Sequence, residues 1–384
     1  MTEDHISSTH PPLPPTTEDD RFAWLRLLRS RRVGISTFYR LMGEHGSAQA
    51  ALEALPDVAR AAGVDGYEIC PEGVVLKEFK AAKFARARLI CRGEPLYPAA
   101  FNDLPDAPPL FWAVGDAGLL SRPSVAIVGA RNASSLGLRM AKTLAGELGQ
   151  AGYTVVSGLA RGIDTAAHIA SLQTGTVAVF AGGVDVLYPS ENAKLAEDMI
   201  AAGGLRISEQ PMGLQPQARH FPMRNRLISG LSRAVVVVEA AAKSGSLITA
   251  RNALDQGRDV FAVPGHPMDA RASGCNMLIR DGAVLVRNAQ DILDEVQSLS
   301  GNEPEQADLD LPVAPPPPQP RRSKQETQAL HQEILDRLGP SPVSEDQLIR
   351  DLNLASSQVS PALTEMELEG RLRRLSGGML ALAV

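Results

Sequence analysis

Residues 123–137 read PSVAIVGARNASSLG, which is a β-branched run, a glycine and the start of an amphipathic stretch. This pattern predicts a buried strand over Val125–Val128 that passes through Gly129 into a helix over Leu136–Gly149. Further apolar runs lie at Thr154–Val156, Thr176–Phe180, Leu205–Ile207, Ala234–Val238, Val260–Val263 and Val284–Val286. Strands of this kind that alternate with helices, such as Gly245–Gln256, predict an α/β fold. We expect a Rossmann-like, doubly wound, mostly parallel sheet covered on both faces.

Composition divides the rest of the chain around this block. The sequence predicts a disordered polar segment (1–19), a helical domain (20–92), the Rossmann-like block with its N-terminal connector (93–300), a Pro-rich linker (301–323) and a small C-terminal domain (324–384). In the last of these, three helical segments and a hairpin signal at Ser376–Gly378 predict a winged helix. In the helical domain, apolar residues on either side of Gly34 resemble a SAM or helix-hairpin-helix module.

Each flanking domain leaves two interpretations open. The N-terminal module can hold backbone phosphate on a helix N-terminus, or it can be a packing or protein-contact domain. The third helix expected in the C-terminal domain carries Glu365, Glu367 and Glu369, and its negative charge repels phosphates. A protein-contact role is therefore favoured there, and weak duplex binding through Arg371, Arg373 and Arg374 is the alternative.

Charge and composition exclude several classes of protein. A net charge of −6 over 384 residues argues against a chain that coats nucleic acid, so any nucleic-acid site must be a local group of arginines. The three cysteines lie far apart, as is typical of a cytoplasmic protein, and no signal segment or membrane-spanning run is present. The seven histidines form no ligand-spaced cluster, so no metal site is expected.

Ligands of such sheets bind where the carboxyl ends of the strands meet the following loops. The first strand ends at Gly129, which lets the backbone approach an anion, and Arg131 adds a cation; the alternative is a turn glycine beside a solvated arginine. The motif is not GxGxxG, and no acidic residue ends the second strand to bind a ribose, so a dinucleotide is not expected. No other cofactor is expected either. After the second strand comes SGLARGID at 157–164, whose small residues and N–H groups predict phosphate binding through Ser157, Gly158, Arg161 and Gly162.

Asp164 and His168 lie four residues apart and could form a catalytic pair, although a structural role is favoured. After the fourth strand, a loop ends in RHFPMRNR at 219–226. Phe221 can stack on a base and the cations can neutralise phosphates, or Phe221 can fill the core while the arginines pair with Glu209 or Glu239. The fifth strand leads into KSGSLIT at 243–249, which again offers hydroxyl and N–H donors to an anion. These two loops add Arg219, Phe221, Arg224, Asn225, Arg226, Lys243, Ser244, Gly245, Ser246 and Thr249 to the candidate residues.

The motifs AIVGAR at 126–131, SGLARGID at 157–164, FPMRNRLISGLS at 221–232, VVEAAAKSGSLITA at 237–250 and GRDVFAVPG at 257–265 resemble, in this order, the DNA-processing protein A (DprA, or Smf) family. The resemblance implies a dimeric, non-catalytic protein that binds single-stranded DNA, protects incoming DNA during natural transformation and helps to load the RecA recombinase. It also implies a basic groove in which Phe221 stacks on a base beside Arg131 and the RNR residues. Some relatives carry a lysine near this phenylalanine, where Ala218, Arg219 and His220 stand here, so Arg219 is the expected replacement.

Two other functions remain as alternatives. One is a nucleotide or nucleoside-phosphate-binding enzyme of the lysine-decarboxylase-like (LOG) type. Such proteins carry a PGGxGT loop and a catalytic glutamate, whereas the comparable loop here is SGSLIT at 244–249. The other is a scaffold that binds only proteins, in which the arginines of the loops are merely solvated.

Overall fold

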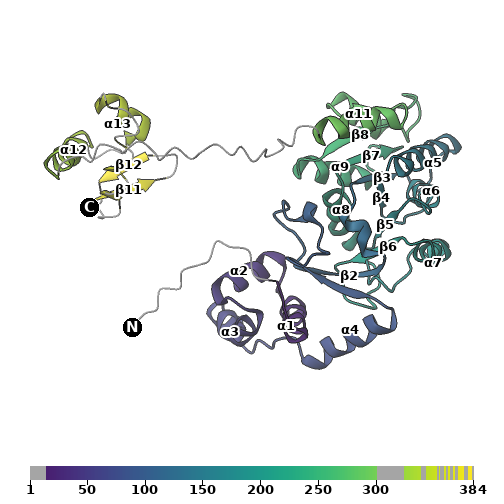
Figure 1. Cartoon of the computed structure of the whole chain (residues 1–384), viewed down its shortest axis with the longest axis horizontal. Helices are drawn as coiled ribbons and strands as arrows, with labels where there is room; N and C mark the ends of the chain where they lie inside the picture. Colours follow the sequence, from purple (N-terminus) through teal and green to yellow (C-terminus); the bar gives the residue numbers. More distant parts are fainter. Residues whose placement is uncertain are drawn as a thin grey trace, which may run out of the picture. The chain divides into compact units, whose positions relative to one another are not determined.

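The computed structural model describes residues 14–300 and, beyond them, 324–338, 343–352, 354, 359, 362–363, 366–367, 371–375 and 379–382. The chain forms two compact units, Met1–Pro304 and Glu305–Val384 (Figure 1). The expected spacer at 301–323 and most of the expected disordered segment at 1–19 lie outside the described residues. Within the described ranges, no helix combines the length and the apolar character needed to cross a bilayer.

Four helices open the first unit: α1 (Glu18–Arg29), α2 (Ile35–His45), α3 (Ala48–Ala61) and α4 (Glu72–Phe84). A capping box starts α1, in which the Asp20 N–H donates to the Thr17 hydroxyl at 3.1 Å and the Thr17 N–H donates to the Asp20 carboxylate at 3.0 Å. The helices share an apolar cluster with the strand that carries Trp112. Trp112 Nε1 also donates a hydrogen bond to the buried Glu78 carboxylate of α4 at 2.7 Å. A polar contact therefore adds to the apolar packing between the helices and the sheet.

The sheet has nine strands in the order β1-β2-β6-β5-β4-β3-β7-β8-β9. The strands are β1 (Arg88–Cys91), β2 (Leu110–Gly115), β3 (Ser124–Gly129), β4 (Thr154–Ser157), β5 (Thr176–Val179), β6 (Leu205–Ser208), β7 (Ala234–Val238), β8 (Asp259–Ala262) and β9 (Val284–Leu285). Pairing is parallel from β6 to β9, and β2 joins β6 in antiparallel fashion. The predicted mostly parallel, doubly wound sheet is confirmed.

Alternate residues of each strand enter different cores, because successive side chains of a strand point to opposite faces. Val125 and Ile127 pack against α5 (Ser135–Gln150), α6 (Ile163–Ala170) and α11 (Ala289–Ser300), whereas Ala126 and Val128 pack in the core that includes α8 (His220–Leu231) and α9 (Ser246–Asp255). The remaining helices of the unit are α7 (Ala193–Ala201), α10 (Ser273–Arg280) and the short 3₁₀ segments η1 (Ala99–Phe101), η2 (Ala117–Ser121) and η3 (Ser190–Asn192).

Residues 88–115 differ from their predicted role. The sequence indicated only a helical domain that ends at 92 and a connector after it. In the structure β1 and β2 form an antiparallel pair that extends the sheet, with Leu89 opposite Trp112. β2 directly follows Pro108 and Pro109, which indicated a connector, and the place of both strands depends on antiparallel pairing with residues outside the local pattern. The domain boundary at 92 remains a prediction, and β1 lies on its N-terminal side.

The second unit contains α12 (Lys324–Arg337), α13 (Glu345–Leu352) and an antiparallel sheet in the order β10-β12-β11. Its strands are β10 (Val343–Ser344), β11 (Leu372–Leu375) and β12 (Met379–Leu382). Ile334, Leu348, Val359 and Leu380 share its apolar core. The predicted strands on either side of 376–378 are present, whereas that turn and most of the third helix expected at 355–369 lie outside the described residues.

Candidate nucleic-acid interface

A cavity of about 710 Å³ lies at the carboxyl ends of β3 and β7. The chain goes from β3 to β4 on one side and returns through β6 to β7 on the other, so this is the switch point where ligands of such sheets bind. Ten of the predicted residues line the cavity: Gly129, Arg131, Phe221, Arg224, Asn225, Lys243, Ser244, Gly245, Ser246 and Thr249. Six predicted residues do not: Ser157, Gly158, Arg161, Gly162, Arg219 and Arg226.

The end of β3 is tightly packed against β7. A Cβ atom on Gly129 would lie 1.9 Å from the Val238 carbonyl oxygen, so only glycine fits at this point of the ladder. The chain then turns outward, and Arg131 is exposed. Its guanidinium carbon Cζ lies 5.5 Å from the centroid of the Phe221 ring, within cation–π range. The turn after β3 therefore places the Arg131 cation beside the predicted aromatic residue, Phe221.

Phe221 lies in the first turn of α8 and is partly exposed at the cavity. It does not fill the core, which was the other interpretation of the sequence. The Arg224 guanidinium carbon lies 5.9 Å from the ring centroid, and the Tyr188 ring centroid lies at the same distance. Phe221 is thus held among two arginines and a tyrosine while part of its surface remains open to a ligand.

Arg224 forms the floor of the site and is not a free cation. It is 7% exposed, and its Nη1 donates to the carbonyl oxygens of Gly158 at 2.6 Å and Val179 at 2.5 Å. Burial lowers the pKa of Arg224 to about 10, and the nearby Asp164 carboxylate opposes this change, so the side chain stays protonated at neutral pH. A Cβ atom on Gly158 would lie 2.4 Å from Arg224 Nη1, so a larger residue here would displace the guanidinium from its present position.

The SGLARGID loop is already occupied by a carboxylate of the protein itself. Asp164 accepts hydrogen bonds from the backbone N–H groups of Gly158 at 3.1 Å and Ala160 at 3.2 Å. We expected N–H groups of this loop to bind a phosphate, and that expectation is corrected for these two, whereas the exposed Arg161 of the same loop stays a candidate. The Ser157 side chain is fully buried, and its hydroxyl donates to the Ile127 carbonyl at 2.6 Å. Burial raises the pKa of Asp164, and the Arg224 charge opposes this rise.

Asp164 and His168 have separate structural roles. His168 is fully buried, and its Nδ1 lies 2.7 Å from the Thr176 hydroxyl. Burial, together with the positive charge of Arg224, lowers the pKa of His168 to about 3. A neutral, solvent-inaccessible imidazole cannot exchange protons with a ligand in the cavity. The contacts therefore favour the structural interpretation over the catalytic pair.

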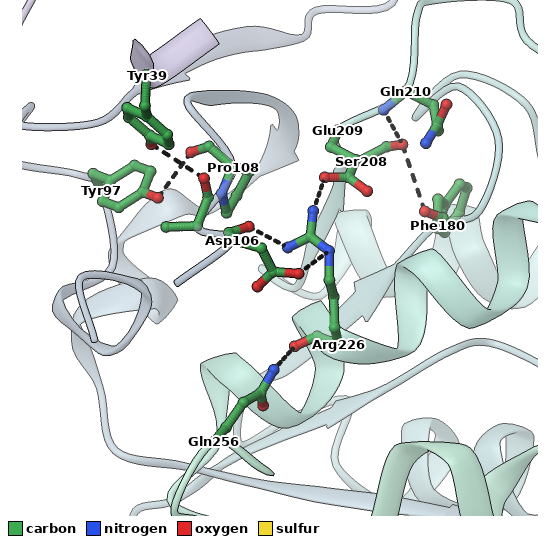
Figure 2. A network of polar contacts seen from close by, with 11 residues as sticks. Tyr39, Tyr97, Asp106, Pro108, Phe180, Ser208, Glu209, Gln210, Arg226 and Gln256 are labelled. Carbon is green, nitrogen blue, oxygen red and sulfur yellow. Dashed lines mark hydrogen bonds and ion pairs between the residues drawn. The ribbon is translucent and has the colours of Figure 1, made fainter. Parts of the chain in front are cut away.

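Arg226 lies away from the cavity, in the polar network of Figure 2. Its Nη1 donates to the Asp106 carbonyl at 2.9 Å, its Nε lies 3.2 Å from the Asp106 carboxylate, and its Nη2 pairs with Glu209. The expectation that Arg226 neutralises a phosphate is corrected in favour of the buried ion pair with Glu209. The two arginines of the RNR motif thus differ because α8 presents Arg224 and Arg226 to different surroundings.

Arg161, Gly162 and Arg219 do not line the cavity, although Arg161 and Arg219 follow the lining residues Ala160 and Ala218. Arg161 is exposed and pairs with Glu191 at 3.7 Å, and Arg219 is exposed with its Nε 3.3 Å from the His220 ring. Gly162, at φ +80°, would place a Cβ atom 2.3 Å from the Ala130 carbonyl oxygen, so it serves loop packing.

The KSGSLIT loop keeps its predicted place in the cavity wall. Lys243 is exposed, whereas the hydroxyls of Ser244 and Ser246 lie 2.7 Å apart and bind one another. Asn225 fixes the loop by donating to the Gly245 carbonyl at 3.3 Å. Thr249 is buried at the base. The loop therefore offers one exposed cation, Lys243, and a small polar surface formed by its two serines.

Sequence reasoning missed Arg271 and Tyr188. Arg271 is exposed, lines the cavity and is held at 3.0 Å by Asp269. Its position in the loop after the sixth predicted strand was a usable signal, since that loop ends at the same edge of the sheet. With Arg131 and Lys243 it makes three exposed cations in the lining, against the single carboxylate of Asp164, which Arg224 balances.

A second cavity, of about 650 Å³, lies beside the N-terminus of α5. Glu239, which has a φ of +54°, accepts a hydrogen bond from the Ser134 N–H at 2.8 Å and binds the Ser134 hydroxyl. A Cβ atom on Gly137 would lie 2.5 Å from the carboxylate carbon of Glu239. The helix terminus that commonly binds a nucleotide phosphate in such folds is therefore filled by an internal carboxylate.

Comparison with known proteins agrees with this architecture. Residues 88–297 match the family model described as DNA recombination-mediator protein A. Residues 18–81 match a DprA-like N-terminal HHH domain, and residues 315–378 match a DprA winged helix domain. These two matches confirm the predicted helix-hairpin-helix-like and winged-helix character of the flanking domains.

Individual relatives are similar over long stretches. The chain is 46% identical over 203 residues to the DNA processing protein DprA of Streptococcus pneumoniae, covering 52% of this chain and 71% of that protein. It is 36% identical over 306 residues to Protein Smf of Escherichia coli, covering 77% of each.

Two solved structures are also similar. The X-ray structure of DprA from Streptococcus pneumoniae has a TM-score of 0.54 and 39% identity, covering 63% of this chain and 86% of that one. A structure that describes the single-stranded DNA binding mode of DNA processing protein A from Helicobacter pylori has a TM-score of 0.51 and 32% identity, covering 56% and 96%. The chain belongs to the DNA recombination-mediator protein A family.

Proposed function

We propose that this recombination-mediator protein binds single-stranded DNA along the carboxyl edge of its sheet, with a base on Phe221 and phosphates on Arg131, Lys243 and Arg271. The observation that carries the proposal is the partly exposed Phe221 ring beside the exposed Arg131 in the lining of the cavity. An aromatic face accepts any base and fixed cations track a backbone, which is how single strands are bound without sequence preference. The Helicobacter pylori relative, whose structure concerns single-stranded DNA binding, supports the same ligand.

Fluorescence anisotropy with a labelled, unstructured oligonucleotide tests this proposal. Binding should weaken with salt, and the Phe221→Ala variant should bind about 5- to 150-fold more weakly, since stacking on an aromatic residue contributes about 1–3 kcal/mol per base. Oligonucleotides of different sequence should lose affinity alike. Unchanged affinity in Phe221→Ala would contradict the proposed groove.

We infer that the site binds and does not catalyse. Glu239 binds the N-cap residue of α5, and Asp164 binds two N–H groups of the loop before α6, so the phosphate of a mononucleotide would be repelled at both places. His168 is buried and neutral. The competing LOG-type activity predicts release of the base from nucleoside monophosphates, so detection of such release by the purified protein would contradict this inference.

The finer role follows the resemblance of the chain to its family. We propose that it protects incoming DNA during natural transformation, loads RecA on the bound strand and therefore acts in the cytoplasm, where its three buried free cysteines stay reduced. Assembly of RecA filaments on limiting single-stranded DNA should be faster with the wild-type chain than with Phe221→Ala. Equal assembly rates with the two proteins would show that RecA loading does not depend on the binding of DNA at Phe221.

We also propose a homodimer formed through β9. Both residues of this edge strand, Val284 and Leu285, are exposed at 38% and 41%, and the nearby Met277 is exposed at 37%. Edge strands with apolar side chains favour pairing with a second chain. Leu285→Lys should convert the dimer to a monomer in light scattering after size-exclusion chromatography, and a wild-type monomer would rule the proposal out.

A further inference from the structure

Tyr188 is an exposed aromatic residue beside Phe221. It lies in the loop after β5, and 48% of it is exposed. Its ring contacts Phe221, with the centroids 5.9 Å apart and the planes tilted by 50°. Within the described part of the chain its hydroxyl makes no hydrogen bond. An exposed aromatic side chain next to a ligand site is more often a contact residue than a packing residue.

The position of Tyr188 extends the groove along the sheet edge. In the strand order, β7 is followed by β3, β4 and β5. The loops that follow these four strands contain, in the same order, Lys243, Arg131, Arg161 and Tyr188. Neighbouring strands are about 4.8 Å apart, so the path from β7 to β5 is roughly 14 Å long. Nucleotides stacked in a duplex rise about 3.4 Å each, and unstacked ones are spaced more widely, so a path of this length has room for the two nucleotides proposed for Phe221 and Tyr188.

A cation also lies next to the end of this path at which Tyr188 is found. Arg161 reaches Glu191, three residues after Tyr188, at 3.7 Å, and both side chains of this pair are more than half exposed. Such a surface ion pair contributes little and is easily exchanged for another anion. Arg161 can therefore turn to a phosphate beside Tyr188 without loss of a stable contact.

We propose that Tyr188 is a second base-stacking residue, which binds the nucleotide next to the one on Phe221, with Arg161 on the adjoining phosphate. The proposal rests on the proposed single-stranded DNA binding and adds length and shape to that site. Because the two rings are tilted by 50°, bases stacked on each of them cannot stack on one another. The strand is bent between these two nucleotides.

Photocrosslinking reads out stacking directly. Oligothymidylate with single 5-iodouracil substitutions is bound to the full chain, irradiated, and the adducts are mapped by mass spectrometry. Adducts are expected on both Tyr188 and Phe221. The Tyr188→Leu variant should lose its own adduct, keep the adduct on Phe221 and bind about 5- to 150-fold more weakly. Tyr188→Phe, which keeps the aromatic face, should bind like the wild type.

The matched control is Phe84→Leu, which removes an exposed aromatic ring at the end of α4, outside the cavity lining, and should change neither affinity nor adducts. An adduct on Phe221 alone, whatever the affinity of Tyr188→Leu, would overturn the proposal, because Tyr188 would then only support the Phe221 ring. A wild-type chain that neither binds the oligonucleotide nor forms any adduct would instead overturn the proposed function itself.

Discussion

The Arg131 guanidinium carbon lies 5.5 Å from the centroid of the Phe221 ring, although Arg131 follows β3 and Phe221 lies in the first turn of α8. Arg226, only five residues after Phe221, points into a different environment and pairs with Asp106 and Glu209. Tertiary contact, and not closeness in the sequence, therefore decides which arginine can meet DNA. Residues that bind DNA and residues that hold the site in place therefore differ in what their substitution should change.

Replacement of Arg131 by alanine should weaken single-stranded DNA binding and make it less sensitive to salt. One lost phosphate contact lowers the slope of log K against log salt by about 0.7. Anisotropy titrations at several salt concentrations measure this slope. Arg139→Ala removes an exposed arginine of α5 that does not line the groove, and should leave the slope unchanged.

Replacement of Arg226 by leucine should reduce stability by about 3–5 kcal/mol, because it leaves the buried Glu209 carboxylate without its partner. Urea unfolding of the variant measures the loss. Replacing both Arg226 and Glu209 by leucine should recover much of it. If the Arg226→Leu variant had normal stability but did not bind DNA, Arg226 would be a DNA-binding residue and the prediction would be wrong.

Replacement of Gly129 by alanine should destabilise the protein by about 1–3 kcal/mol, since the added Cβ atom would lie 1.9 Å from the Val238 carbonyl oxygen. The matched control is Gly146→Ala in the interior of α5, where no atom lies within 4 Å of the new Cβ atom. That variant should gain up to about 1 kcal/mol from its higher helix propensity. Thermal unfolding distinguishes the two, and equal effects would contradict the close approach of β3 and β7.

Stability should fall as the pH is lowered below about 6.5, because His168 is buried in its neutral form. Its pKa is lowered from 6.5 to about 3 in the folded chain, so between these values the unfolded chain binds the extra proton. The loss amounts to at most about 1.4 kcal/mol per pH unit and is absent above pH 7.5. Urea unfolding at pH 7.5 and pH 5 measures it. His168→Asn should show a smaller difference between the two pH values, and an equal difference would assign the effect to other groups.

Much of the fold could be predicted because its signals are local. The seven apolar runs of the central block correspond to strands β3 to β9, and the helices at Leu136–Gly149 and Gly245–Gln256 are found as Ser135–Gln150 and Ser246–Asp255. The strands β1 and β2 were missed, because their place in the sheet depends on antiparallel pairing with β6 and on packing against the N-terminal helices. Such contacts join residues that are distant in the sequence.

By itself, the sequence determined the alternation of strands and helices, and with it the edge at which the loops with Arg131, Phe221 and Lys243 must gather, because parallel strands all end on one side. Only the tertiary structure decided the state of each charge: Arg131 is exposed, Arg224 is buried against Gly158 and Val179, and Arg226 is paired with Glu209. The physical reason is that burial and ion pairing depend on which distant groups surround a side chain, and an arginine has the same local pattern in all three cases.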